Sequence, residues 1–238
     1  MLQMSDAQTP EGLDLMFVMD TTGSMGDELQ YVKEELKDVV QRIEAPVRLS
    51  CNFYRDHDDV YTIRPFPFES DLDTVLKQIS SQRAAGGGDY EEAVDLALID
   101  GVEEHQWSSS AKARILFLVL DAPPHLNDEV IANMKAVTAA AAQKGIRIVP
   151  VASSGVDKNT EFLMRTLAIA TNGTYLFLTD DSGIGNSHLD PSAGEYDVEY
   201  LNDLMLSVIS LEIASNDSIS ASGMYFARPI FSRTGRLI

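Results

Sequence analysis

The sequence has very little cysteine, which excludes one common way of stabilising a fold. Its 238 residues include a single cysteine, Cys51, so no disulfide framework can form within the chain. Cys51 lies in an apolar run typical of a strand, where a lone thiol behaves as a small core side chain. Hydrophobic residues make up 45% of the sequence, which is enough for one large α/β domain with a full core.

Basic residues are also scarce. The chain has 18 Lys and Arg residues against 37 Asp and Glu residues, a formal net charge of −19. An electrostatic field of this sign repels polyphosphates, so we expect no nucleic-acid partner. The excess of carboxylates fits a cation-binding protein and fits an ordinary soluble surface equally well.

Long apolar runs are missing too. No run is long enough to span a bilayer, so we expect no membrane insertion. Residues 1–11 lack the basic and apolar regions of a signal peptide. From the chain as given we expect a cytoplasmic location, or one outside the cytoplasm in the cell envelope if the chain is a domain excised from a longer protein.

Strand and helix signals alternate along the chain. Short apolar runs predict strands over residues 13–19, 47–54, 60–68, 114–120, 146–152 and 173–178. Apolar residues at helical spacing and helix-ending signals predict one helix that begins near Ser24 and carries its apolar stripe over residues 29–43, and further helices over residues 71–82, 90–104, 127–144, 160–170 and 198–213.

This order indicates an α/β fold with a doubly wound, mostly parallel six-stranded sheet and helices on both faces. One edge strand should be antiparallel, because the link Arg55–Asp59 is too short for a crossover helix and Pro65 and Pro67 follow it. We expect a single domain over residues 13–214, preceded by an N-terminal lead, 1–12. The structure of the C-terminal tail, 215–238, stays undefined.

Ligands of such a sheet bind beyond the carboxyl ends of its strands, and three polar motifs should meet there. The first strand ends in Asp20-Thr21-Thr22-Gly23-Ser24 and the fourth in Asp121-Ala122-Pro123-Pro124-His125, and Gly86-Gly87-Gly88-Asp89 lies between them in the sequence. Alternate residues of a turn share a side, so Asp20, Thr22 and Ser24 can surround one point. Carboxylate and hydroxyl oxygens suit a hard cation, with Mg²⁺ favoured over Mn²⁺ or Ca²⁺.

Simpler structural roles are the alternative for each motif. Asp20, Thr22 and Ser24 could form a capped helix start after a strand. Asp121 could belong to an ordinary turn at a strand end. Asp89 could be the N-cap of the helix that follows it.

The first motif resembles the Asp-x-Ser-x-Ser signature of the metal ion-dependent adhesion site in von Willebrand factor A domains, with Thr22 keeping the hydroxyl of the first serine. In that family a threonine from a later loop and an aspartate after the fourth strand complete the site, and Asp121 matches this aspartate. The similarity extends from Leu13 to about Ile213 and is greatest to bacterial members. Gly88 stands where the family has its threonine, and Asp89 is the substitute that we expect.

The resemblance implies a metal-dependent protein-binding module and not an enzyme. One divalent cation would be held by Asp20, Thr22, Ser24, Asp89 and Asp121, and a partner's Asp or Glu carboxylate would fill an open coordination position. His125 and Gly88 are the residues expected to face that partner.

Two alternatives stay open at this point. The first is a structural scaffold module whose metal site is vestigial or purely stabilising. The second is a Mg²⁺-dependent phosphoryl-transfer enzyme with an aspartate nucleophile, which is less favoured because Thr22 stands where a second acid is needed.

Two other acidic segments invite a metal-binding interpretation. We expect Arg55-Asp56-His57-Asp58-Asp59 to be a polar hairpin connection, with a second metal site as the alternative. The loop Thr179–Glu195 is expected to carry solvated acids, with a calcium site as the alternative.

Overall fold

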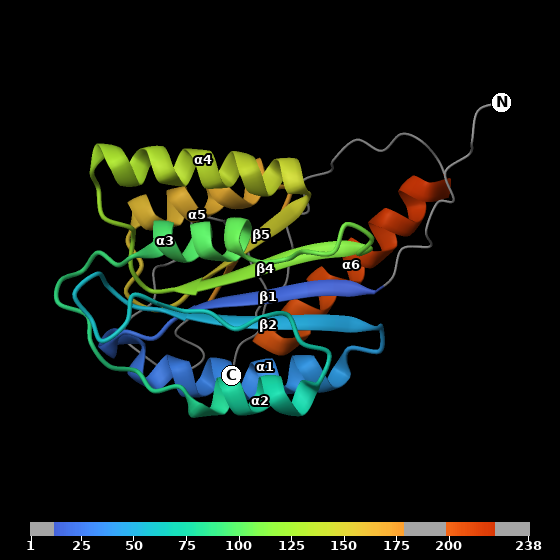
Figure 1. The fold of residues 1–238 in the computed structure, drawn as a ribbon, viewed down its shortest axis with the longest axis horizontal. Coiled ribbons are helices and arrows are strands. Elements are labelled where there is room, and N and C mark those ends of the chain that lie inside the picture. Colours follow the sequence, from blue (N-terminus) through green and yellow to red (C-terminus); the bar gives the residue numbers. More distant parts are fainter. Residues whose placement is uncertain (1–11, 179–198, 222–238) are drawn as a thin grey trace.

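The strands form one open sheet between two layers of helices (Figure 1). The computed structural model describes residues 12–178 and 199–221. Its six strands are β1 (Leu13–Asp20), β2 (Val47–Tyr54), β3 (Ile63–Arg64), β4 (Ala113–Leu120), β5 (Ile146–Ala152) and β6 (Leu176–Phe177). They lie in the order β3-β2-β1-β4-β5-β6, and all neighbours are parallel except β2 and β3. The predicted fold class is confirmed.

Helices cover both faces of this sheet. One face carries α1 (Gly26–Arg42), α2 (Leu72–Ser81) and α6 (Leu201–Ala221), and the other carries α3 (Val94–Ile99), α4 (Asp128–Lys144) and α5 (Lys158–Ala170) (Figure 1). A short 3₁₀ turn, η1 (Gly23–Met25), joins β1 to α1, and a π-helical turn, η2 (Asp100–Glu104), follows α3. Among the described helices, none is both long and apolar enough to cross a membrane.

The central strand β1 is buried along its whole length, which explains its nearly continuous apolar sequence. Leu15, Phe17 and Met19 pack towards α1, whereas Met16 and Val18 pack towards α3 and α4. In β2 the thiol of Cys51 is also fully buried, beside Phe17 in the register of the sheet.

Several elements differ from their predicted lengths, among them β6, which has two residues rather than the six expected over residues 173–178. β3 has two residues rather than the nine expected, because Pro65 and Pro67 have no N–H to donate to a ladder. The predicted helix over residues 90–104 begins only at Val94, with Ala93 as its N-cap. Residues before it are held out of the helix because the Glu92 N–H donates to the Pro123 carbonyl at 2.9 Å. The alternative that Asp89 caps this helix is therefore wrong.

The ends of the predicted domain are only partly described. α6 continues to Ala221, beyond the expected helix end at residue 213. Residues 1–11 of the lead, residues 222–238 of the tail and the acidic loop Thr179–Glu195 lie outside the described residues. The domain boundaries at residues 13 and 214 stay predictions.

Candidate metal centre

The carboxyl ends of β1 and β4 bring four predicted ligands together. These strands are neighbours in the sheet, and each runs directly into a buried aspartate, Asp20 or Asp121. The backbone N–H and the hydroxyl of Thr22 both donate to Asp20 Oδ1, each at 2.7 Å. The Thr22 and Ser24 hydroxyl oxygens are 3.1 Å apart, and Ser24 also hydrogen-bonds to Asp121. A continuous set of oxygen atoms therefore links the two strand ends.

The negative charge of this cluster has no cation to balance it among residues 12–178 and 199–221. Asp20 Oδ2 and Asp121 Oδ1 are buried without a hydrogen-bond partner, and no described Lys or Arg forms an ion pair with either carboxylate. Burial, followed by repulsion from Asp121, raises the pKa of Asp20 to about 7. Burial also raises the pKa of Asp121. A divalent cation would reverse both effects.

A third buried carboxyl group, Glu92, escaped the sequence analysis. Its side chain is 2% exposed and Oε2 has no hydrogen-bond partner. Burial is the largest cause that raises the pKa of Glu92, to about 9, and the charges of Asp20, Asp56, Asp121 and Asp59 add to it. The available signal was an acidic residue directly before the apolar stretch that begins at Ala93. Asp89, in contrast, is exposed, and as a metal ligand it stays a prediction.

The glycine turn packs directly against the first motif. Gly23 N–H donates to the Gly86 carbonyl at 3.0 Å, and Gly87 N–H donates to Asp59 Oδ2 at 2.9 Å. Gly86 has a φ of +83°, a conformation that side chains with a Cβ rarely adopt. A Cβ on Gly87 would lie 3.2 Å from Glu92 Oε1. The positive φ of Gly86 and the close approach of Gly87 to Glu92 thus explain why both positions are glycine.

Gly88 is the glycine of the turn that has free space around it. It is exposed, and a Cβ added to it would meet no atom within 4 Å. Its predicted role in facing a partner stays a prediction.

His125 is bound to the loop that follows β2. Its Nε2 lies 2.7 Å from Asp56 Oδ1, and its ring centroid is 5.2 Å from that of His57. Burial lowers the pKa of His125, but the hydrogen bond and charge of Asp56 outweigh burial, so the net shift is upward. Asp56, His57 and His125 offer ligand atoms that all lie within 4.8 Å of one another. The polar hairpin connection therefore also contains a group able to hold a metal ion.

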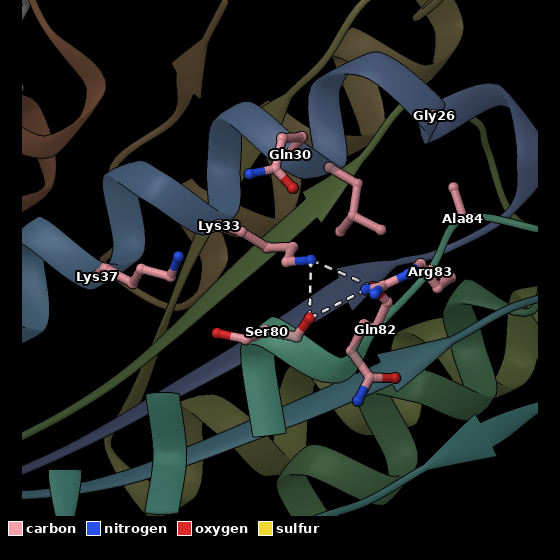
Figure 2. A pocket seen from close by; sticks show the side chains of 9 residues that line it. Gly26, Gln30, Lys33, Lys37, Ser80, Gln82, Arg83 and Ala84 are labelled. Carbon is pink, nitrogen blue, oxygen red and sulfur yellow. Dashed lines mark hydrogen bonds between the residues drawn. The ribbon is translucent and has the colours of Figure 1, made fainter. Parts of the chain in front are cut away.

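A pocket of about 330 Å³ lies between α1 and the segment that follows α2, and basic residues line it (Figure 2). The Lys33 ammonium donates to the Ser80 and Gln82 carbonyls, each at 3.2 Å. Arg83 donates to the same two oxygens, at 3.1 and 2.9 Å. Burial, then the charges of Arg83 and Lys37, lowers the pKa of Lys33. Gly26, two residues after Ser24 in the sequence, is one of the residues that line the pocket.

Comparisons with known proteins concern the family and the fold of this chain. A family model for the von Willebrand factor A domain matches residues 14–186. The chain is 34% identical over 119 residues to an ariadne-like RING finger protein of Acanthamoeba polyphaga mimivirus, a match that covers 48% of this chain and 11% of that protein. It therefore spans about a tenth of the length of that relative.

A solved structure, the conserved protein BatB from Bacteroides thetaiotaomicron, has a similar fold. The match has a TM-score of 0.61 and covers 87% of this chain and 100% of that one. The two sequences are 14% identical, so the likeness concerns the fold alone.

Proposed function

The chain belongs to the von Willebrand factor A domain family, and from this premise we propose that it is a cation-dependent protein-binding module. Domains of this family are generally interaction modules that bind protein partners, and they often hold a divalent cation. The observation that carries the proposal is the cluster of buried carboxyl groups, Asp20, Asp121 and Glu92, with buried oxygens that no described hydrogen-bond donor satisfies. Such a cluster is costly without a cation.

Asp20, Thr22, Ser24 and Asp121 would hold the cation, which we propose to be Mg²⁺ rather than Mn²⁺ or Ca²⁺. All four residues offer oxygen atoms, the ligands that a hard cation prefers. A further ligand would come from the segment after the glycine turn. Asp89 and Glu92 are the two candidates, and we favour Glu92 because its carboxyl group is buried beside Asp20 and Asp121.

The bound cation would offer a coordination position to an Asp or Glu side chain of the partner. In the metal-free protein the same carboxylate would meet like charges, which repel it by several kcal/mol. The basic pocket adds a second contact, because Lys33, Lys37 and Arg83 line it in a chain of net charge −19. We therefore propose an acidic segment of a protein as the ligand, with one carboxylate on the cation and another at the pocket.

The first test is calorimetric titration of Mg²⁺ into chelator-treated protein. We expect one bound cation per chain, no binding by Asp20→Ala, and unchanged binding by Asp58→Asn, a matched change of an exposed loop acid. Glu92→Gln should weaken the affinity by roughly tenfold, about 1.4 kcal/mol, whereas Asp89→Asn should leave it within twofold. If Asp89→Asn instead weakens the Mg²⁺ affinity tenfold and Glu92→Gln leaves it unchanged, Asp89 is the ligand.

The partner is tested with fluorescent peptides that carry one or two Asp or Glu residues, compared with their Asn and Gln counterparts. Binding should require both Mg²⁺ and the acidic side chain. Lys37→Gln combined with Arg83→Gln should reduce the affinity for the two-acid peptides only. If folded protein binds no cation, the alternative of a scaffold with a vestigial site replaces this proposal.

A further inference from the structure

We propose that Asp56, His57 and His125 form a second cation site, distinct from the oxygen-lined centre and specific for a zinc-like divalent ion. Their ligand atoms lie within 4.8 Å of one another. Asp56 and His57 follow β2, whereas His125 follows β4, so the fold brings together loops from two strands that β1 separates in the sheet. We call these three residues the rim site.

The ligand types decide which cation the rim site can hold. Two imidazole nitrogens and one carboxylate oxygen are a donor set typical of Zn²⁺ and of other late first-row metals, and Mg²⁺ prefers oxygen atoms alone. Three protein ligands also leave the fourth tetrahedral position to water or to a side chain of another molecule.

The distances between the three ligand atoms allow a metal ion after small side-chain movements. Zinc ligands at about 2.0–2.1 Å in a tetrahedron are roughly 3.3 Å apart. The 2.7 Å contact between His125 Nε2 and Asp56 Oδ1 must therefore open slightly, and His57 must move inward by no more than about 1.5 Å from the 4.8 Å limit. Because His57 is exposed, a change of its side-chain rotamer can supply this movement.

The surroundings favour a cation at the rim site over a simple His125–Asp56 ion pair. Asp89 and Glu91 act on His125 as negative charges in addition to Asp56. The nearest basic residue in the sequence, Arg55, donates to the carbonyls of Thr21 and Arg83, and it forms no ion pair among the described residues. The carboxylates of this loop therefore keep an excess of negative charge that one histidine does not cancel.

The test uses the full chain without a histidine tag, stripped with chelator. Co²⁺ is the spectroscopic probe, because tetrahedral Co²⁺ with nitrogen ligands absorbs visible light strongly, and Zn²⁺ affinity is measured in competition with a chromophoric chelator. We expect one Zn²⁺ per chain at the rim site, and tetrahedral Co²⁺ bands that persist in excess Mg²⁺. His57→Gln and His125→Gln should each lower the Zn²⁺ affinity at least tenfold and abolish the Co²⁺ bands.

Two control variants separate the rim site from the oxygen-lined centre. Asp58→Asn changes an exposed acid of the same loop and should alter neither metal. Asp20→Ala should lose Mg²⁺ and keep Zn²⁺, whereas His57→Gln should lose Zn²⁺ and keep Mg²⁺, so the two proposals can fail separately. Zn²⁺ affinity that is unchanged in both histidine variants, or that disappears in Asp20→Ala, would overturn the rim site. Because the His57 side chain is exposed, His57→Gln keeps the test valid even if His125→Gln fails to fold.

Discussion

Strand β1 has a buried aspartate near each end, and the two side chains have very different hydrogen-bond partners. Asp14, near the amino end, is 1% exposed and accepts hydrogen bonds from Arg48 Nε at 2.8 Å, Arg48 Nη2 at 2.6 Å and Ser108 N–H at 2.6 Å. Asp20, at the carboxyl end, is 0% exposed and has hydrogen bonds from Thr22 to Oδ1, but none to Oδ2. The described residues therefore balance the negative charge of Asp14, at the amino end of β1, but not that of Asp20, at its carboxyl end.

This difference fits the proposal that one end of β1 serves stability and the other serves cation binding. Arg48 and the Ser108 N–H give Asp14 a complete set of partners, which makes the amino end a closed structural contact. The carboxyl end retains a charge that the described residues do not balance, and costly arrangements of this kind are concentrated at functional sites. The contrast between the two aspartates supports the proposed cation at Asp20.

The largest expected effect is on the pH dependence of the metal-free protein. The folded-state pKa of Asp20, about 7 rather than the usual 3.8, means that folding disfavours its ionised form. The resulting penalty is absent below pH 4 and complete above pH 7, so the free energy of unfolding should fall by roughly 2–4 kcal/mol between these values. Glu92, with a pKa of about 9, extends the fall to higher pH.

Urea unfolding in chelator at several pH values measures this slope. Saturating Mg²⁺ should flatten it, because the cation stabilises the ionised carboxylates. A profile in chelator that is flat between pH 5 and 8 would contradict the account of the carboxyl end.

The next effect compares the two aspartates directly. Asp14→Asn removes half of an ion pair whose arginine side chain is 37% exposed, so we expect a loss of about 1–3 kcal/mol in unfolding free energy. Asp20→Asn in chelator at pH 8 removes a destabilising charge and should leave the stability equal or higher, while Mg²⁺ binding disappears. Urea unfolding of both variants in chelator at pH 8 is the measurement. Equal losses of unfolding free energy in Asp14→Asn and Asp20→Asn would contradict the difference between the two aspartates.

The smallest effect concerns a glycine at each end of the sheet. Gly12 has a φ of +63° and an added Cβ would lie 2.5 Å from the Pro46 carbonyl oxygen, whereas at Gly86 the Cβ would meet the Asp59 carboxylate. Both Gly12→Ala and Gly86→Ala should lose about 1–2 kcal/mol of stability, because the positive φ strains the new side chain and its Cβ meets neighbouring atoms. Only Gly86→Ala should also weaken Mg²⁺ binding, because its turn contacts the first motif. Calorimetry and urea unfolding check both effects, with Gly88→Ala as the neutral control.

The parts of the fold that were predictable from sequence are those set by local patterns. The apolar run over residues 13–19 and its counterpart over 114–120 predicted two buried strands. Because parallel neighbours end at the same edge of a sheet, the positions of Asp20 and Asp121 followed from the same pattern.

The parts that were not predicted depend on contacts between distant loops. Residues 90–93 have helical periodicity, but the backbone N–H of Glu92 donates to the Pro123 carbonyl, and the helix begins only at Val94. Likewise, the pairing of His125 with Asp56 joins loops 69 residues apart. Neither contact leaves a periodic or spacing signal, because each depends on how two turns meet in space.

The position of Cys51 has a practical consequence for studying the motions of the sheet. This thiol is the chain's only one, it is fully buried in β2 beside Phe17, and burial raises its pKa well above the ordinary value. A thiol-reactive dye can reach it only when the core between the sheet and helices α1 and α2 opens. The labelling rate in native buffer therefore counts spontaneous openings at the centre of the molecule, without any engineered probe.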